Sequence, residues 1–393
     1  MTTAYLWSPA LEAAADELPA NRGRSSTVHA LIRALGLVSD DGGPGTARVV
    51  APDPALGSAS ELARYHARGY VEYLLEARGE SESDTESDDD ADGPRKRRRT
   101  MGLEHDCPPF PALPAYASLV AAATLTACAL LARGEARTAV VWDGGRHHAL
   151  KGRATPRARI LYLDLDLHYG DGVAQAFASP THFPHPLKGR PRPPQVLTLS
   201  VHHAAAGFFP PAAPGLTPAD TPHPFSLSLP LAAYASSATY ARLWASVERI
   251  KAAYRPHYVV LQLGVDGLPR DPVGRYGAWG VSGDGGVPAL VGRVMAWGVP
   301  TAVLGGGGYD SANAARAWAL ATATLVGRDD LRPATDVPDH DGWEAYAPGY
   351  TLEVELSHIP DENTDAQLAA AYDAFKVLAA RIAEIVDLHD RPV

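Results

Sequence analysis

Short runs of Val, Ile and Leu recur along the chain, and longer stretches rich in Ala and Leu lie between them. The short runs are typical of buried β-strands, and the longer stretches have the length of helices. The alternation predicts an α/β fold in which helices cover both faces of a mainly parallel sheet. Strands are predicted at Thr138–Trp142, Arg159–Leu163, Gln195–Val201, Tyr258–Leu263 and Pro300–Leu304, and helices at Tyr234–Tyr254, Pro288–Trp297 and Ser311–Val326.

Polar residues stand at the carboxyl end of each predicted strand. Because these ends lie along one edge of a parallel sheet, and ligands bind beyond that edge, we expect an active site there. The residues are Asp143 to His148 after the first strand, Asp164 to His168 after the second, His202 and His203 after the third, Asp266 after the fourth, and Gly305 to Tyr309 after the fifth.

The motif Asp164-x-Asp166-x-His168 has the residue types of a metal site. Alternate residues of an extended segment face the same side, so Asp166 and His168 point together, and Asp266 comes from another strand. Two carboxylates and one imidazole, with open positions for water and substrate, suit a catalytic divalent ion. A polar cluster with a purely structural role is the alternative.

His147 and His148 follow a glycine turn on the same edge of the predicted sheet. Asp164 and Asp171 are carboxylates that can orient the two imidazole rings. Tyr309 follows four glycines, and a tyrosine held by bare backbone beside a metal can donate a hydrogen bond to a developing oxyanion. The alternatives are histidines that are hydrogen-bonded for structural reasons and a turn that is merely flexible.

Residues 78–100 break this pattern. Eight carboxylates lie between Glu80 and Asp92, and five basic residues follow at Arg95–Arg99. Such a segment cannot bury apolar surface, so we expect a disordered acidic and basic insertion within a single domain spanning residues 1–393. The basic cluster resembles a nuclear-import signal. The alternative is a solvated linker that carries no targeting information.

The remaining composition argues against several classes of protein. A net charge of −10 does not favour direct binding to nucleic acid. Two cysteines, Cys107 and Cys128, provide no disulfide framework and fit a reducing compartment. The N-terminus lacks the pattern of a signal peptide. The apolar stretch from Tyr116 to Ala132 predicts a buried helix and no interaction with a membrane.

Seven motifs of this chain resemble those of the zinc-dependent histone deacetylases, and the class I type most. They follow one another in the order found in that family and cover nearly the whole chain outside residues 78–100. The resemblance implies an arginase/deacetylase-like fold and hydrolysis of the acetyl amide of N-ε-acetyl-lysine, giving lysine and acetate. The motifs are RSSTVH at 24–29, HDCP at 105–108, GGRHH at 144–148, YLDLDLHYGDGV at 162–173, GFFP at 207–210, LQLGVD at 261–266 and GGGGY at 305–309.

The resemblance implies two metal sites. A catalytic zinc ion would be held by Asp166, His168 and Asp266. A structural potassium ion would be bound by Asp164, Asp166, His168 and Ser200, partly through backbone carbonyls. Zinc lowers the pKa of a bound water to about 7, so that hydroxide is available at neutral pH.

The resemblance also implies catalytic and substrate-binding roles. His148 would be the general base, oriented by Asp171, and His147, paired with Asp164, would be an electrostatic or acid partner. Tyr309 would polarise the acetyl carbonyl and stabilise the tetrahedral intermediate. Substrate contacts are expected at Asp106 on the rim, at Phe209 in the wall of the acetyl-lysine tunnel, and at Gly307.

The partners implied are acetylated histone tails or other acetyl-lysine proteins, together with corepressor subunits. The expected setting is the nucleus, and also the cytoplasm, with chromatin and transcriptional repression as the outcome.

The chain departs from the family pattern at four places. Arg146 replaces an aromatic residue, Tyr169 a histidine, and Val273 a leucine or methionine of the pocket rim. After Lys151 the family has a Gly-Phe loop and a helix, whereas here residues 152–158 lead almost directly into the next strand. The second aromatic wall of the tunnel is therefore missing.

Two alternative functions follow from the sequence. The missing wall favours a catalytically weak or inactive zinc-binding scaffold with the deacetylase fold. The second alternative is a two-metal ureohydrolase, which shares this architecture. It is disfavoured because Gly267 and Leu268 follow Asp266, where a second metal would need another acid.

Overall fold

The computed structural model describes residues 2–64, 66–76, 108–147, 158–177, 195–211 and 213–390. The predicted insertion at 78–100 and the short connection after His147 lie outside these ranges, apart from Ala158. The elements in chain order are β1 (Thr3–Leu6), α1 (Pro9–Asp16), α2 (Arg24–Ala34), β2 (Val38–Ser39), β3 (Ala47–Val50), η1 (Pro54–Gly57), α3 (Ala59–Leu62), α4 (Arg68–Glu76), α5 (Leu113–Ala132), β4 (Thr138–Val141), β5 (Arg159–Asp164), α6 (Asp171–Phe177), β6 (Gln195–His203), β7 (Ser226–Leu231), α7 (Ser237–Tyr254), β8 (Tyr258–Gln262), α8 (Val287–Ala296), β9 (Thr301–Leu304), α9 (Ser311–Val326), η4 (Trp343–Tyr346) and α10 (Asp365–Asp390).

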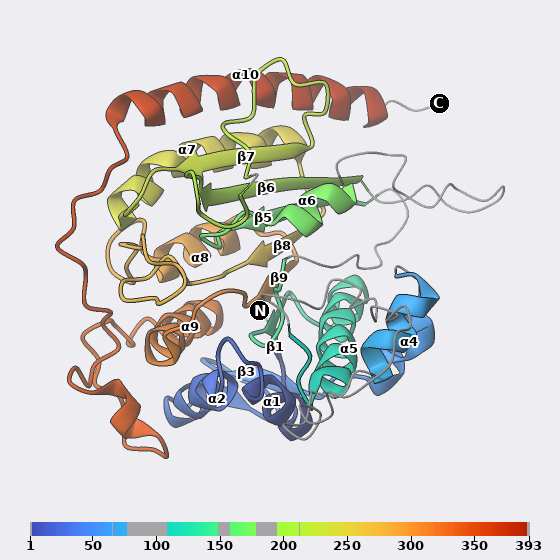
Figure 1. Cartoon of the computed structure of the whole chain (residues 1–393), viewed down its shortest axis with the longest axis vertical. Coiled ribbons are helices and arrows are strands. Elements are labelled where there is room, and N and C mark those ends of the chain that lie inside the picture. The colour runs from blue at the N-terminus through green and yellow to red at the C-terminus, as the bar shows by residue number, and fades with distance from the viewer. Residues whose placement is uncertain are drawn as a thin grey trace, which may run out of the picture.

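Within the described residues the strands form one nine-stranded sheet in the order β2-β3-β1-β4-β9-β8-β5-β6-β7. Every pairing in it is parallel. Helices lie on both sides of the sheet, and α10 runs along the outer side of α7 (Figure 1). This confirms the predicted α/β fold with a mainly parallel sheet.

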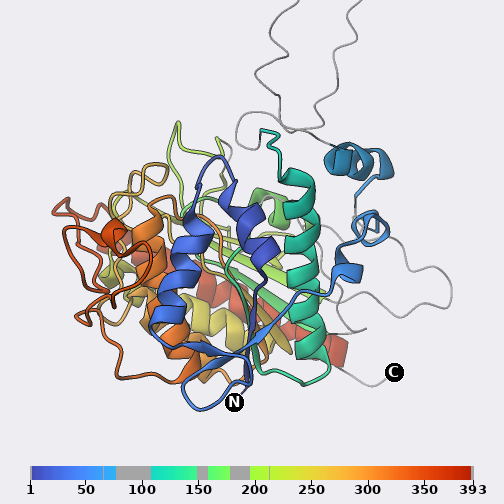
Figure 2. The same ribbon diagram turned by 90° about the horizontal axis from the view of Figure 1, so that it is seen from below.

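Alternate residues of the strands supply two separate hydrophobic layers. Tyr5 and Val140 face the layer that contains α2, α7, α8 and α9. Ala4, Leu6 and Val141 face the opposite layer, which α5 covers. The helices α1, α2 and α5 stand side by side around the N-terminal strands (Figure 2). The nearly unbroken apolar strands are thus explained by burial on both faces.

Helix α5 is, among the described residues, the one helix of 18 or more residues that is apolar enough to cross a membrane by length and composition. Its residues Ala123 and Ala127 are fully buried and pack in one cluster with Ala4 of β1 and Ala139 of β4. The contacts match the buried helix predicted for this stretch.

The start of α7 differs from the prediction. We expected a helix from Tyr234, but Tyr234 has a φ of 59°, in the left-handed region that a right-handed helix does not use. Ser236 caps the helix instead, since its side chain accepts the N–H of Thr239. Helix α9 is capped by Asp310, whose carboxylate accepts the N–H of Asn313 at 3.0 Å.

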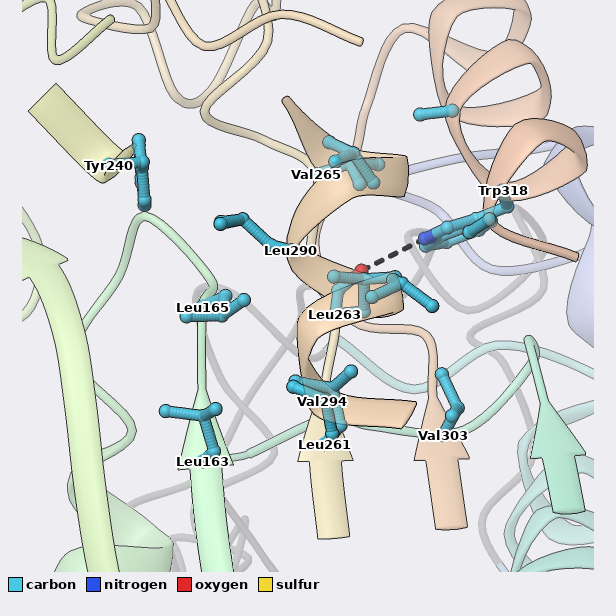
Figure 3. Packing of buried hydrophobic residues seen from close by; sticks show 14 of the residues in the cluster. Leu163, Leu165, Tyr240, Leu261, Leu263, Val265, Leu290, Val294, Val303 and Trp318 are labelled. Atoms are coloured by element: carbon cyan, nitrogen blue, oxygen red, sulfur yellow. Dashed lines mark hydrogen bonds between the residues drawn. The ribbon is translucent and has the colours of Figure 1, made fainter. Parts of the chain in front are cut away.

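The hydrophobic core directly supports the strand ends that carry the polar residues. Leu163, Leu261 and Val303 of β5, β8 and β9 pack in one cluster with Leu290 and Val294 of α8 (Figure 3). The buried α9 residue Trp318 fixes the neighbouring turn. Its indole N–H donates a 2.9 Å hydrogen bond to the carbonyl of Leu263, and its ring stacks on Trp142 at the end of β4. The core therefore holds the backbone from which the polar residues project.

Candidate metal centre and active site

The predicted site residues come from four adjacent strands, β4, β9, β8 and β5. Asp164 ends β5, and Asp166 and His168 lie in the turn that follows it. His147 follows β4, Asp266 follows β8, and Tyr309 follows the glycine run after β9. Two of the predicted site residues, His148 and Asp106, lie outside the described residues.

Asp166, His168 and Asp266 form a compact buried cluster. One ligand atom from each lies within 4.8 Å of the other two. The Nδ1 atom of His168 is 2.6 Å from Asp266 Oδ2 and 3.4 Å from Asp166 Oδ1. Ligand atoms arranged tetrahedrally around one zinc ion lie about 3.4 Å apart, so small adjustments admit an ion. The donor set of two carboxylates and one imidazole fits zinc.

Charge also favours a cation at this cluster. Burial and the neighbouring charge of Asp166 raise the pKa of Asp266 to about 7. Burial alone would lower the pKa of His168, but the charge of Asp266 and hydrogen bonds to both carboxylates raise it to about 11. Two carboxylates so close together in a buried site repel each other, and a divalent cation would relieve that repulsion.

The carboxylates are held by groups from distant parts of the chain. Asp166 Oδ2 accepts hydrogen bonds from the side-chain amide of Gln262 at 2.9 Å and from the N–H of Gly307 at 2.8 Å. Asp266 Oδ1 accepts the N–H of Leu167 at 2.8 Å. No role was predicted for Gln262. The signal available was a polar residue at the end of the apolar strand β8.

Two glycines are required by close approach to the carboxylates. A Cβ on Gly307 would lie 2.3 Å from Asp266 Oδ2, and a Cβ on Gly264 would lie 2.0 Å from Asp166 Oδ2. Gly307 is therefore in contact with both proposed ligand carboxylates, in addition to the substrate contact predicted for it. The run of four glycines is a close-packed turn, which argues against the reading of a merely flexible one.

His147 is buried and paired with Asp164. Its Nδ1 is 2.8 Å from Asp164 Oδ2, and its Nε2 is 3.7 Å from Asp166 Oδ1. Burial alone would lower the pKa of His147, but Asp164 and Asp166 outweigh it and raise the pKa to about 9. Asp171 begins α6 and accepts the N–H of Gly172. Its predicted pairing with His148 remains a prediction.

Tyr309 is positioned by hydrogen bonds to its own backbone and to the backbone of the turn before it. Its N–H donates a 2.7 Å hydrogen bond to Asp271 Oδ2. Burial, followed by the charges of Asp266 and Asp166, raises the pKa of Tyr309 above its ordinary value, so its hydroxyl keeps its proton at neutral pH. The buried guanidinium of Arg24 donates to the carbonyls of Gly306 and Gly308, at 2.8 and 2.9 Å, and braces the turn before Tyr309.

The histone deacetylase domain family matches this chain over residues 18–156 and 154–325. The chain belongs to the histone deacetylase family. It is 31% identical over 391 residues to histone deacetylase 8 of Danio rerio, which covers 95% of this chain and 93% of the relative. It is 32% identical over 377 residues to histone deacetylase 8 of Xenopus tropicalis, covering 90% of each. These matches confirm the class I-like resemblance and a deacetylase of the hydrolase class.

A plant histone deacetylase is also similar. Histone deacetylase 6 of Arabidopsis thaliana is 30% identical over 334 residues, which cover 79% of this chain and 64% of the relative. The two stretches matched by the deacetylase family meet at residues 154–156. That is the connection predicted to lack the family's Gly-Phe loop and helix.

Aromatic residues of this deacetylase flank the cluster of Asp166, His168 and Asp266 on one side. The ring of Phe208 stacks on His168, with 4.8 Å between centroids and 12° between planes. Phe209, the predicted tunnel wall, lies 6.2 Å from His168 and is 43% exposed. Phe208 had no predicted role, although it adjoins Phe209 in the same motif. The pair places one ring against the imidazole of His168 and the next ring toward solvent.

The departures from the family pattern have specific contacts. Arg146 donates hydrogen bonds to the hydroxyl of Tyr116 at 3.1 Å and to Asn21 Oδ1 at 3.2 Å. The ring of Tyr169 packs against His202, with centroids 4.7 Å apart. Val273 is 43% exposed, in the loop that leads away from Asp266. None of these three residues takes the place of Asp166, His168 or Asp266.

Proposed function

We propose that this chain catalyses zinc-dependent hydrolysis of the acetyl amide of N-ε-acetyl-lysine in histones and other proteins. The observation that carries the proposal is the buried cluster of Asp166, His168 and Asp266, with Tyr309 and His147 grouped around it. When bound there, zinc would supply a Lewis acid and a bound water with a pKa of about 7.

The residues of this chain would supply the rest of the chemistry. The neutral hydroxyl of Tyr309 would donate a hydrogen bond to the oxygen on which negative charge develops. His147, held by Asp164, would provide a positive charge beside that centre. A bound divalent cation would offset the negative charge of Asp166, and it would thereby lower the pKa of His147 from its raised value. His148, oriented by Asp171, would accept a proton from the attacking water.

Substrate binding would use the rim and the aromatic wall. Asp106 would hold the backbone of the substrate, Phe209 would contact the lysine stem, and Gly307 would border the acetyl group. A structural potassium ion would be bound by Asp164, Asp166, His168 and Ser200, partly through backbone carbonyls. In the structure the Ser200 hydroxyl lies 3.0 Å from Nδ1 of His202.

A second candidate is a zinc-binding scaffold with weak or no turnover. It is favoured by one observation, the division of the family match at residues 154–156, where the second wall of the tunnel is expected. Both candidates require the metal cluster, so they differ in catalytic rate and not in metal binding.

An assay of acetate release from an acetyl-lysine peptide distinguishes the two candidates. The purified chain is expected to be active with zinc, to lose activity with a metal chelator, to regain it when zinc is restored, and to be inhibited by a hydroxamate. Stoichiometric zinc without turnover would favour the scaffold. A chain that binds no zinc would contradict both.

The cellular setting is proposed from the sequence alone. We propose that the chain acts in the nucleus, with corepressor subunits, to repress transcription. Arg95–Arg99 supports the location, as the dense basic cluster within the predicted insertion. Replacing these five residues by glutamine should reduce nuclear accumulation of a fluorescent fusion. Unchanged accumulation would contradict the import signal.

A further inference from the structure

A surface groove lies beside the loop that carries the metal ligand Asp266. Its volume is about 290 Å³. Two arginines, two aliphatic residues, one tyrosine and one glutamate contribute most of its side-chain lining: Arg270, Arg275, Leu356, Ile359, Tyr234 and Glu355. The family resemblance and the proposed chemistry assign no role to this groove.

The groove is connected to the metal centre through Tyr276. The ring of Tyr276 packs against Phe208, with centroids 5.9 Å apart, and Phe208 stacks on His168. The carbonyl of Tyr276 accepts the N–H of Tyr234 at 2.7 Å, and the two rings meet edge to face. One wall of the groove is therefore continuous with the aromatic residues that flank the metal cluster.

The loop that presents the arginines is fixed rigidly to the metal-ligand segment. A Cβ on Gly274 would lie 1.9 Å from the carbonyl oxygen of Asp266, and a Cβ on Gly277 would lie 2.3 Å from that of Gly267. The loop thus folds back directly on the residues around Asp266. Arg275, between these two glycines, has its position set by the same contacts.

The backbone around the groove is unusual. Four non-glycine residues in the described part of the chain have a positive φ, and three of them line this groove. They are Tyr234 at 59°, Arg270 at 67° and Arg275 at 44°. Non-glycine residues adopt this conformation rarely, and they persist in it where the surrounding structure over-determines it, often at binding sites.

The charge of the groove is positive and available to a ligand. Arg270 and Arg275 are exposed, and within the described ranges neither makes an ion pair with a carboxylate. Glu355 is the acidic residue in the lining, so the arginines outnumber it. Leu356 and Ile359 are 52% and 49% exposed beside them. A guanidinium can bind a carboxylate through two parallel hydrogen bonds, and the aliphatic pair can cover an apolar neighbour.

We propose that this groove binds the substrate polypeptide next to the acetylated lysine and selects substrates with an acidic side chain there. The inference rests on the proposed deacetylase function, because it assigns the groove to that substrate. An extended chain advances about 3.3–3.6 Å per residue, so a residue a few positions from the lysine reaches a groove that shares a wall with the site. A lysine in a purely basic segment would be a poorer substrate.

The test uses acetyl-lysine peptides that differ at a single position. Glu, Gln or Lys is placed in turn at each of three positions on either side of the lysine, and kcat/KM is measured with the full chain loaded with zinc. At one or more positions on one side, Glu should exceed Gln by roughly two- to tenfold, as expected for exposed ion pairs. High salt should reduce this ratio, since it screens exposed charges.

Matched variants assign the preference to the groove. In Arg270→Asn/Arg275→Asn the Glu-to-Gln ratio should fall to about one, and Asn tolerates the positive φ at both positions. Arg255→Asn is the control. Arg255 is also an arginine with a positive φ, 52°, but it caps α7 beside the start of β5, on the opposite edge of the sheet. This variant should keep the ratio of the unaltered chain. Because both peptides are measured with the same variant, a change in its folding or metal content affects both kcat/KM values equally and leaves the Glu-to-Gln ratio unchanged.

The possible outcomes distinguish failure of the groove proposal from failure of the proposed deacetylase function. A ratio of one at every position, a preference for Lys, or a ratio that survives the double substitution would each overturn the groove proposal while leaving the deacetylase function intact. If no peptide is hydrolysed, the deacetylase function fails. Binding of the same labelled peptides, measured by fluorescence anisotropy, then decides whether the arginines select an acidic peptide.

Discussion

The N–H of Tyr309 donates a 2.7 Å hydrogen bond to Oδ2 of Asp271, a residue that is 5% exposed. The other oxygen of that carboxylate accepts the N–H groups of Val273 and Gly274, at 2.9 and 2.7 Å. One buried side chain thus connects the turn that positions the proposed oxyanion donor with the loop that forms the groove. Displacement of the turn at Tyr309 would therefore disturb the loop at Val273 and Gly274, and displacement of the loop would disturb the turn.

Asp271→Asn should impair turnover by misplacing Tyr309. An amide offers one acceptor oxygen where the carboxylate offers two, so at least one buried N–H loses its partner, at about 1–3 kcal/mol. We expect a lower melting temperature and a lower kcat with zinc retained.

A double-mutant cycle with Tyr309→Phe shows whether Asp271 acts through Tyr309. The single substitution Tyr309→Phe should reduce turnover roughly 10²–10³-fold by removing the proposed oxyanion donor. Asp271→Asn should then add little further loss of kcat in the Tyr309→Phe background. If the loss of kcat in the double variant equals the product of the two single losses, Asp271 does not act through the hydroxyl of Tyr309. Near-normal turnover of Tyr309→Phe would make Tyr309 a structural residue.

Asp166→Ala and Asp266→Ala should each abolish zinc binding. Each removes one of three protein ligands, and the two that remain make an incomplete site. Zinc content of the purified variants measures the effect. Asp284→Ala, at an exposed acid in the turn before α8, is the matched control and should retain the metal. Stoichiometric zinc in both ligand variants would refute the assignment.

Gly307→Ala should weaken metal binding without any change in ligand type. The added methyl group would lie 2.3 Å from Asp266 Oδ2 and 2.9 Å from Asp166 Oδ2, so one or both carboxylates must move. We expect at least a tenfold loss of zinc affinity, of the size seen when groups supporting metal ligands are altered. Gly215→Ala is the control, since nothing lies within 4 Å of a Cβ there. Equal zinc affinity in the two variants would contradict this account of the turn.

Asp361 should give α7 a stability that depends on pH. Its carboxylate accepts hydrogen bonds from the N–H and hydroxyl of Ser236 and from the hydroxyl of Thr239. Burial opposes ionisation, but these bonds outweigh it and lower the pKa of Asp361. The folded pKa is thus below the unfolded value of about 3.9, so the stabilisation is complete above that value and is lost as the pH falls through the folded pKa.

Asp361→Asn tests this sign. It should lower the melting temperature at neutral pH, and the gap from the unaltered chain should narrow as the pH falls below about 4. Melting curves measured from neutral pH down to about 3 check the trend. A gap that widens in acid would mean that the carboxylate does not stabilise the fold through its charge.

The sequence predicted those parts of the site that depend on local spacing. Asp164, Asp166 and His168 alternate along one segment, and Asp266 and Tyr309 follow apolar runs. Because the carboxyl ends of parallel strands lie along one edge of the sheet, this pattern was sufficient to predict that these residues lie close together. The five predicted strands are all present, with ends that differ by at most two residues. In the part of the chain that the structure describes, four further strands were not predicted, because β1, β2 and β3 have two to four residues and β7 mixes Ser and Pro with Leu.

The site residues that were not predicted make contacts with residues far away in the sequence. Gln262 binds Asp166, 96 positions away, and Asp271 binds the backbone of Tyr309, 38 positions away. Neither partnership leaves a periodic pattern in the sequence. The early start predicted for α7 has a similar cause, because the left-handed conformation of Tyr234 is set by its contact with Tyr276 and not by its own propensity.

The last prediction concerns the connection between His147 and β5, where the two family matches meet. An acetyl-lysine stem is held by apolar walls on both sides, and this chain offers Phe209 for one of them. Loss of the opposite aromatic wall should forfeit roughly 1.5–3 kcal/mol of apolar burial, about tenfold to over a hundredfold in substrate binding. It would also admit water, which weakens the electrostatic effect of His147 and Tyr309 on the reacting group.

We therefore expect the chain to bind zinc but to deacetylate weakly and to have a low melting temperature. Inserting a Gly-Phe loop and a helix between Lys151 and Arg159 should raise both kcat/KM and the melting temperature. An insertion of equal length made of Gly and Ser is the control, since it restores the length of the connection without an aromatic wall or a helix to cover the sheet. If the unaltered chain equals the restored one in both measurements, the short connection is harmless and the catalytic scaffold is complete without it. If the Gly-Ser chain gains as much as the restored one, length alone limits the native connection, because His148 must reach toward a metal held from the next strands.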